Sequence, residues 1–307
     1  MSSLLVLEQI LNGLQLGVTL FLMAAGLTLV FGIMGLINLA HGSLYMIGAF
    51  VAASVTGATG SFLLGLLAAV PAAAAVGVAI EVIALRRLYE RDHLDQVLAT
   101  FGLILLLNEL ASILWGARPL FMDVPPWLAG TVEILPGVPY PAYRLAIILV
   151  GVLVAGLLYL LIARTRLGML IRAGATNRAM VGALGVDVAR LYTLVFAIGA
   201  GLAALAGVMA GPILSVQVGM GEQILILTFV VVVIGGLGSI KGALAGALLV
   251  GLVDTLGRAF LPTLLRVALP PASADAVGAS LASMTIYILM AAVLVWRPNG
   301  LFGRPHA

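Results

Sequence analysis

Two polar side chains, Asn38 and His41, stand between Gly35 and Gly42 in the otherwise apolar stretch FGIMGLINLAHGSLYMIGAF. An imidazole and an amide three positions apart could bind a polar ligand or hold an irregular backbone. The glycines allow the chain to leave helical geometry, because glycine lacks the side chain that restricts other residues. The pattern therefore predicts a broken helix whose polar groups either cap the break or act on something that reaches it.

The other residues that could take part in catalysis or ligand binding do not form a catalytic or nucleotide-binding pattern. The stretch GGLGSIKG at 235–242 carries glycines and a lysine, but it lacks the Gly-Lys-Ser/Thr ending of a phosphate-binding loop. The chain has no cysteine, and its three histidines lie in different regions: His41, His93 and His306. We therefore expect no enzyme activity, no metal site and no cofactor bound by this chain.

The composition predicts that the chain is a membrane protein. Of the 307 residues, 63% are hydrophobic and 9% are charged, whereas a soluble domain has roughly 25% charged residues. The arginines lie beside apolar runs and not on one face of a soluble fold, so the net charge of +3 does not indicate nucleic-acid binding. Ahead of the first apolar run stands Glu8 and no basic residue, so we expect that run to stay in the protein as a span.

The fold predicted from these runs is all-α, a polytopic transmembrane helical bundle of eight or nine spans that forms one domain over residues 1–307. The uncertain segment is 36–56: if it crosses fully there are nine spans, and if it is re-entrant there are eight with the N-terminus on the inner side. We favour nine. The runs are long enough to cross a hydrocarbon layer of about 30 Å, and they cover 10–33, 36–56, 61–85, 94–115, 142–163, 191–214, 223–240, 242–261 and 281–296.

Arginine clusters orient these spans, because basic residues concentrate in cytoplasmic loops. An even number of predicted spans separates the clusters, so all of them fall on the same, inner side together with the C-terminus. The loop 116–141 then lies outside. The clusters are Arg86, Arg87 and Arg91, then Arg164, Arg166, Arg172, Arg178 and Arg190, then Arg297 and Arg304.

Polar residues inside predicted spans are costly and usually mark a pathway or a partner. Glu81 is close enough in sequence to Arg86 and Arg87 for a local ion pair. Asp254 either packs against a partner or lines a route. The break at Asn38 and His41 either is capped by these side chains or lines a substrate route, as broken helices do in transporters. The candidates are Asn38, His41, Glu109, Gln217 and Asp254.

Small residues four apart predict close helix packing, because they let helix backbones approach each other. They occur as Gly13 with Gly17, Ala203 with Gly207 and Gly211, and Gly238 with Gly242 and Gly246.

The inner loop at 164–190 is too polar to span and too long for a tight turn. It predicts a short helix over about 172–184 that ends at Gly185 in a left-handed conformation. The loop is either a solvated connector or a docking helix for a cytoplasmic partner.

Several stretches together resemble the membrane-spanning permease subunits of branched-chain amino acid ABC transporters, the LivH type. The resemblance covers nearly the whole chain, and its departures are minor: Leu39 replaces a common aromatic residue, Ser43 a frequent acidic one and Asp254 a frequent Glu. The stretches are GLTLVFGIMGLINLAHGSLYMIGAFVA at 26–52, ATFGLIL at 99–105, the segment 171–212, VVIGGLGSIKGALAGALLVGLV at 232–253 and RPNGLFGRP at 297–305.

This resemblance implies an importer in the cell inner membrane with alternating access. A second homologous permease would complete the route, two cytoplasmic ABC ATPase subunits would use the ATP, and an external solute-binding protein would deliver Leu, Ile or Val. The loop 171–187 would couple the ATPases to the spans. The residues carried over for coupling are Arg172, Ala173, Asn177, Gly182 and Gly185, and those assigned to the substrate pathway are Asn38, His41, Gly42 and Asp254.

Two alternatives stay open. Closely similar permeases serve urea and short-chain amides, so the substrate could differ within the family. A protein of another class, an ion-coupled secondary transporter, would need a coupling carboxylate near the middle of the membrane, for which Asp254 is the candidate.

Overall fold

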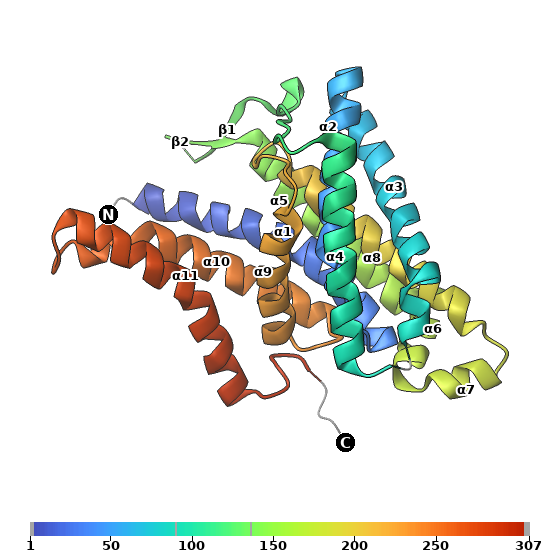
Figure 1. Cartoon of the computed structure of the whole chain (residues 1–307). Coiled ribbons are helices and arrows are strands. Elements are labelled where there is room, and N and C mark those ends of the chain that lie inside the picture. The colour runs from blue at the N-terminus through green and yellow to red at the C-terminus, as the bar shows by residue number, and fades with distance from the viewer. Residues whose placement is uncertain (1–2, 90, 136, 304–307) are drawn as a thin grey trace. The chain divides into compact units, whose positions relative to one another are not determined.

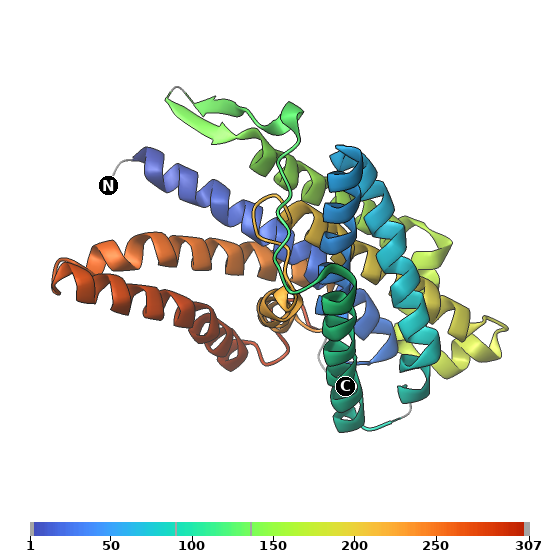
Figure 2. The ribbon, with the colours of Figure 1, turned by 45° about the horizontal axis from the view of Figure 1, so that its top comes forward.

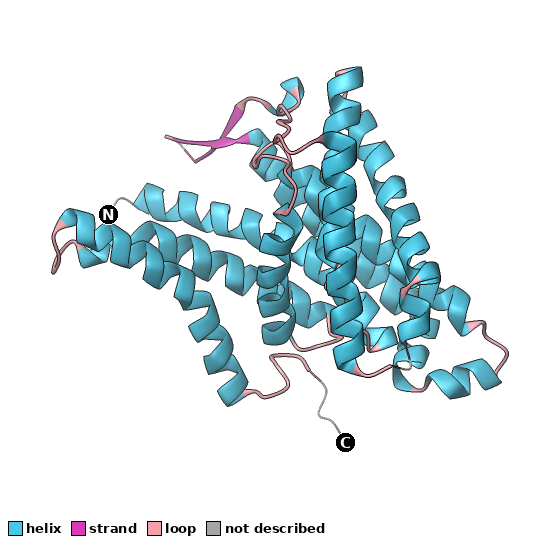
Figure 3. Cartoon of the chain, in the orientation of Figure 1, coloured by secondary structure: helices cyan, strands magenta, loops and turns pink. Residues whose placement is uncertain are grey.

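A computed structural model describes residues 3–89, 91–135 and 137–303, so Arg304, His306 and the end of the 297–305 motif lie outside the described residues. Within those ranges the chain is mostly helical (Figure 3). The helices are α1 (Ser3–Met34), α2 (His41–Thr59), α3 (Phe62–Ile83), α4 (His93–Trp115), α5 (Ala142–Arg164), α6 (Arg166–Thr176), α7 (Arg178–Ala183), α8 (Val188–Ala210), α9 (Met220–Gly235), α10 (Ile240–Leu265) and α11 (Pro271–Trp296).

Eight of the described helices are long and apolar enough to cross a membrane: α1, α2, α3, α4, α5, α8, α10 and α11. The predicted helical bundle of eight or nine spans is therefore confirmed. The segment 36–56, which the sequence left open, forms α2 with 19 residues. The favoured count of nine spans is not reached among the described helices, because the segment predicted at 223–240 forms the shorter helix α9. Its 16 residues extend about 24 Å, less than the hydrocarbon layer of about 30 Å.

The chain divides into two compact units, and the prediction of a single domain over 1–307 stays a prediction. The first unit comprises Met1–Phe21, Pro126–Val152 and Thr228–Ala307, and the second comprises Leu22–Pro125 and Leu153–Leu227. In the second unit α3 packs along both α2 and α8, and α2 also packs on α8 and α4. Figures 1 and 2 show these helices side by side. This unit contains the break between α1 and α2.

In the first unit α10 and α11 pair along their length, as Figure 2 shows. The N-terminal part of α1 approaches α10 closely: a Cβ added at Gly17 would lie 2.9 Å from the Ala247 carbonyl oxygen, and one added at Gly13 would lie 3.0 Å from the Leu252 Cα. These contacts confirm the packing role predicted for Gly13 and Gly17.

The predicted outer loop 116–141 is more ordered than expected. It contains the antiparallel strands β1 (Thr131–Leu135) and β2 (Val138–Pro141), drawn in magenta in Figure 3. Two single-turn 3-10 helices, η1 (Leu85–Leu88) and η2 (Pro126–Leu128), complete the described elements. The Tyr140 hydroxyl at the end of the hairpin donates to the Asn12 side-chain oxygen over 3.0 Å, which ties the hairpin to α1 within the first unit.

Candidate functional site

The predicted break is confirmed between α1 and α2. Helix α1 ends at Met34, Gly35 takes a left-handed φ of 65°, and α2 begins at His41. Asn38 shapes the turn, because its side-chain oxygen accepts the Ala40 N–H over 3.1 Å and its backbone oxygen accepts the His41 N–H over 3.4 Å. The amide therefore replaces part of the helical hydrogen bonding that the break removes.

Both predicted polar side chains at the break are fully buried. Asn38 and His41 have no exposed surface, and among the described residues neither the Asn38 Nδ2 nor either ring nitrogen of His41 has a hydrogen-bond partner. The backbone of Met23 is a neighbour of the imidazole, but it does not reach hydrogen-bond geometry. A buried polar group without a partner costs about 1–3 kcal/mol, so the break keeps groups that folding alone disfavours.

Glycines on neighbouring helices make the room for His41. A Cβ added at Gly26 of α1 would lie 2.9 Å from the His41 Nε2 and 2.7 Å from the Gly199 carbonyl oxygen of α8. The imidazole therefore lies where α1 and α8 approach each other. Any residue other than glycine at position 26 would displace the ring or separate the two helices.

Gly42, the third predicted pathway residue, lies against the first turn of α9. A Cβ added at Gly42 would be 2.4 Å from the Gly221 carbonyl oxygen, and one added at Gly221 would be 2.3 Å from the Gly42 carbonyl oxygen. The starts of α2 and α9 thus meet backbone to backbone. The structure brings Asn38, His41 and Gly42 together as one closed junction, which we call the break junction.

Asp254, the fourth predicted pathway residue, belongs to the first unit and is paired with a cation. Both of its carboxylate oxygens accept from the Arg258 Nε, over 3.0 and 2.9 Å, one turn further along α10. The Asp254 side chain is 8% exposed and that of Arg258 is 54% exposed. The sequence left two interpretations of Asp254 open, packing against a partner or lining a route. The structure shows a charge partner, Arg258, on its own helix.

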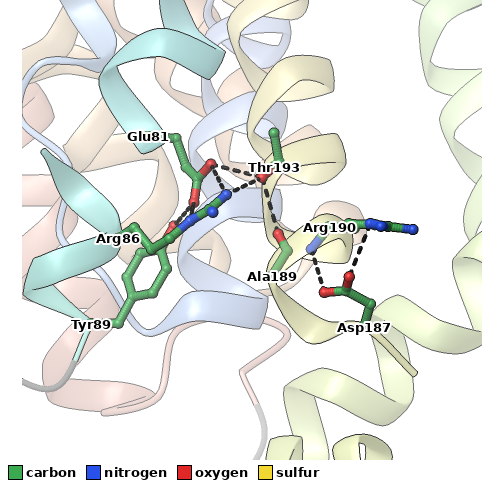
Figure 4. Close-up of polar contacts among 7 residues, drawn as sticks. All are labelled: Glu81, Arg86, Tyr89, Asp187, Ala189, Arg190 and Thr193. Carbon is green, nitrogen blue, oxygen red and sulfur yellow. Dashed lines mark hydrogen bonds and ion pairs between the residues drawn. The ribbon is translucent and has the colours of Figure 1, made fainter. Parts of the chain in front are cut away.

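The local ion pair predicted at Glu81 is confirmed for Arg86 and extends further than expected (Figure 4). The Arg86 Nε and Nη2 donate to the two oxygens of Glu81 over 3.2 and 3.1 Å. The Tyr89 hydroxyl donates to Oε1 over 2.6 Å, and the Thr193 hydroxyl of α8 donates to Oε2 over 2.8 Å. We call these four residues the Glu81 joint, and Tyr89 and Thr193 were not predicted.

The inner loop forms two short helices, so the prediction of one helix over 172–184 was wrong. Asn177 has an extended backbone between α6 and α7, and its side-chain oxygen accepts the Met180 N–H over 3.0 Å. Asparagine favours such a cap over the interior of a helix, which is why the helix divides there. The left-handed stop at Gly185 is confirmed by its φ of 85°.

All five residues predicted for coupling lie on this loop and are exposed: Arg172, Ala173, Asn177, Gly182 and Gly185. Arg172 donates to the Ile162 carbonyl oxygen, and Ala173 and Gly182 accept the backbone N–H groups of Asn177 and Gly185. Two large apolar side chains are exposed beside them, Met180 at 63% and Leu184 at 77%. The loop therefore presents a mixed polar and apolar surface.

One polar contact within the second unit was not predicted from the sequence. The Asn108 amide of α4 donates to the Glu222 carboxylate in the first turn of α9. Glu222 lies one position before the apolar segment predicted at 223–240, and Asn108 lies inside the segment 94–115. A count of every amide and carboxylate within the predicted segments and at their edges would have included both residues.

Comparison with known proteins adds a family. A family model described as "Branched-chain amino acid transport system / permease component" matches residues 9–294. The chain is 34% identical to the high-affinity branched-chain amino acid transport system permease protein BraD of Pseudomonas aeruginosa, with 98% of this chain and 96% of BraD covered.

Two further relatives show how far the likeness extends. The chain is 32% identical to the high-affinity branched-chain amino acid transport system permease protein LivH of Escherichia coli, again over 98% of this chain and 96% of the relative. It is 29% identical to the ribose import permease protein RbsC of Escherichia coli, over 76% of this chain and 72% of that protein. No solved structure matches the chain.

Proposed function

Because the chain belongs to the family of branched-chain amino acid transport system permease components, we propose that it is the membrane-spanning subunit of an ATP-binding-cassette importer for Leu, Ile and Val. Membership itself makes the chain a transport permease, and its apolar helices make it a multi-pass membrane protein. The observation that carries the proposal is the break junction, because buried polar groups without partners between two apolar helices of a transporter are expected along the substrate route.

The proposed complex contains further chains. A second permease, homologous or identical, completes the route, two cytoplasmic ABC ATPases hydrolyse ATP, and an external solute-binding protein delivers the substrate. The permease lies in the cell inner membrane with its C-terminus in the cytoplasm. The exposed loop from α6 to α7 supports this assembly, since exposed Met180 and Leu184 beside capped backbone suit a groove on a partner.

In the proposed mechanism the structure corresponds to a state in which the break junction is closed. Gly42 lies against Gly221, and Gly26 lies against Gly199, so the His41 ring is out of reach of any solute. When ATP-driven movement separates these backbones, Asn38 and His41 offer free nitrogens to the charged groups of the amino acid. The glycine-lined path leaves the apolar side chain of the substrate with few fixed contacts.

The choice among substrates rests on the relatives. The family description and the permeases BraD and LivH carry the name of branched-chain amino acid transport, whereas RbsC carries that of ribose. Urea and short-chain amides stay the alternative. The ion-coupled transporter loses support, because Asp254 is paired with Arg258 and is not a free coupling carboxylate.

Reconstitution tests the proposal. The permease is purified with the ATPases and second permease encoded beside it, placed in liposomes with the cognate binding protein, and supplied with ATP and labelled leucine. We expect uptake that requires ATP and is competed by isoleucine and valine but not by urea or ribose. Uptake driven by an ion gradient without ATP would contradict the importer, and competition by urea or ribose alone would contradict the substrate class.

Cross-linking tests the docking loop separately. The chain has no native cysteine, so a single cysteine at Met180 is a clean probe. We expect Met180→Cys to cross-link to an ATPase subunit in the assembled complex. The control is Leu149→Cys, which is similarly exposed at 63% but lies in the middle of α5. Equal cross-linking from both positions, or none from Met180, would contradict the docking role.

A further inference from the structure

We propose that the Glu81 joint fixes the start of α8 to the end of α3, so that movement of the inner loop reaches the break junction through these two helices. This inference rests on the proposed function, because it assigns the path by which ATPase movement acts on the route. Thr193 is the member of the joint on α8. Glu81 lies near the end of α3, Arg86 lies in η1 and Tyr89 directly follows η1.

The joint lies directly after the inner loop. Asp187 caps α8, since its side-chain oxygen accepts the Arg190 N–H over 3.1 Å, and the Arg190 Nε contacts the same carboxylate at 3.0 Å (Figure 4). Thr193 follows six residues after this cap, about 9 Å along the helix. A capped helix of this length transmits displacement as a rigid rod, so movement of α7 reaches Thr193 with little loss.

The Glu81 carboxylate is fully buried and both of its oxygens are used twice. One accepts from the Arg86 Nε and the Tyr89 hydroxyl, and the other accepts from the Arg86 Nη2 and the Thr193 hydroxyl. The Arg86 Nη2 also donates to the Thr193 hydroxyl over 2.8 Å. A buried carboxylate with these partners cannot follow a shift of α8 past α3 without losing charge-assisted bonds. The two helix ends therefore move together.

The charge states of the donors favour the same conclusion. The hydrogen bond and the charge of Glu81 raise the pKa of Arg86. Burial, followed by the hydrogen bond to Glu81, raises the pKa of Tyr89. Both groups keep their protons at neutral pH, so both stay donors. The Tyr89 ring also meets the Tyr192 ring of α8 edge to face, with centroids 5.3 Å apart, which adds an apolar contact next to the polar one.

From the joint, packing continues to the break. In the second unit α3 packs along α8 and α2, and a Cβ added at Gly77 of α3 would lie 2.7 Å from the Ala200 side chain of α8. A Cβ added at Gly48 of α2 would likewise lie 2.5 Å from the Ala204 backbone of α8. Since α2 begins at the break, a common movement of α3 and α8 displaces the polar residues there.

Thr193→Val is the sharpest test, because it removes the hydroxyl on α8, keeps the shape, and leaves Glu81 with Arg86 and Tyr89. In the reconstituted complex we expect ATP hydrolysis to continue while the ATP consumed per leucine transported rises about tenfold, the equilibrium equivalent of about one hydrogen bond. Thr193→Ser keeps the hydroxyl and should restore the wild-type ratio. The control is Thr285→Val on α11, which loses the same kind of bond to the preceding turn but belongs to no joint.

A second measurement tests, without a transport assay, whether the joint holds the inner loop to α3. Spin labels on cysteines at the exposed positions Ala75 of α3 and Leu184 after α7 report how firmly the loop is held to α3. We expect a narrow distance distribution in the wild type and Thr193→Ser, and a broad one in Thr193→Val. If Thr193→Val leaves the distance distribution or the ATP consumed per leucine unchanged, the proposed role of the joint is overturned. Absence of ATP-dependent uptake in the wild type would overturn the proposed function, and the label distances would still decide the joint.

Discussion

The break junction and the Glu81 joint both bury polar side chains in the second unit, but they treat them in opposite ways. At the joint, a carboxylate without exposed surface has every oxygen bonded by a donor from η1 or α8. At the break, Asn38 Nδ2 and both His41 nitrogens have no partner within the described residues. A saturated buried group serves to hold helices together, whereas an unsaturated one gives up stability. The difference supports a holding role for the joint and the proposed substrate contact for the break.

The largest effect is expected where the break junction closes. Gly42→Val should lower the free energy of unfolding by about 3 kcal/mol or more, because its Cβ would overlap the Gly221 carbonyl oxygen and backbone cannot yield as a side chain does. Thermal unfolding of the purified permease in detergent measures this loss. The control is Gly57→Val near the other end of α2, where an added Cβ meets nothing within 4 Å. Equal melting temperatures for the two variants would mean that the junction is open in solution.

A smaller loss is expected at the joint. Glu81→Ala should lower the free energy of unfolding by about 2 kcal/mol, because it leaves the Tyr89 hydroxyl and the Arg86 guanidinium without their acceptor, whereas the Thr193 hydroxyl keeps the Ala189 carbonyl oxygen. The measurement is again thermal unfolding, with Glu109→Ala on the exposed face of α4 as control. A loss no larger than that of the control would show that the joint is not saturated in the membrane protein, and the contrast with the break would disappear.

These two regions also show what a single sequence can predict. The break was predictable because glycines and polar residues interrupt an apolar run, and the observed helix ends at Met34 and His41 confirm it. The Glu81–Arg86 pair was predictable because its members are five residues apart. Signals of this kind are local, so they can be read from neighbouring residues alone.

The partners from distant segments were not predictable. Thr193 is 112 residues from Glu81, and nothing in either segment indicates the other. Gly42 indicates a close approach, but Gly221 as its counterpart follows only from the packing of α9. The prediction of a single inner helix was wrong for a different reason. An alanine-rich sequence favours a continuous helix, but the cap formed by Asn177 outweighs that preference.

Within the break junction, Asn38 should contribute modestly to stability. Asn38→Ala removes the acceptor of the Ala40 N–H, and we expect a loss of about 1 kcal/mol, as for a lost cap. Asn38→Asp keeps the acceptor and should recover most of the loss in thermal unfolding. If both variants unfold like the wild type, the turn is held by its backbone alone. The Asn38 side chain, like that of His41, then makes no hydrogen bond that stabilises the fold.

The smallest effect on stability, and the most informative one, is expected at His41. His41→Leu replaces a ring whose nitrogens have no partner with an apolar side chain of similar volume, so the free energy of unfolding should change by less than about 1 kcal/mol. Leucine uptake should nevertheless fall at least about tenfold, the equivalent of one lost polar contact to the substrate. Met46→Leu, another fully buried change in α2, should alter neither quantity. Marked destabilisation by His41→Leu would mean that the imidazole is bonded after all and belongs with Glu81 among the structural groups. Unchanged uptake with unchanged stability would remove His41 from the route and leave the break as a feature of the fold alone.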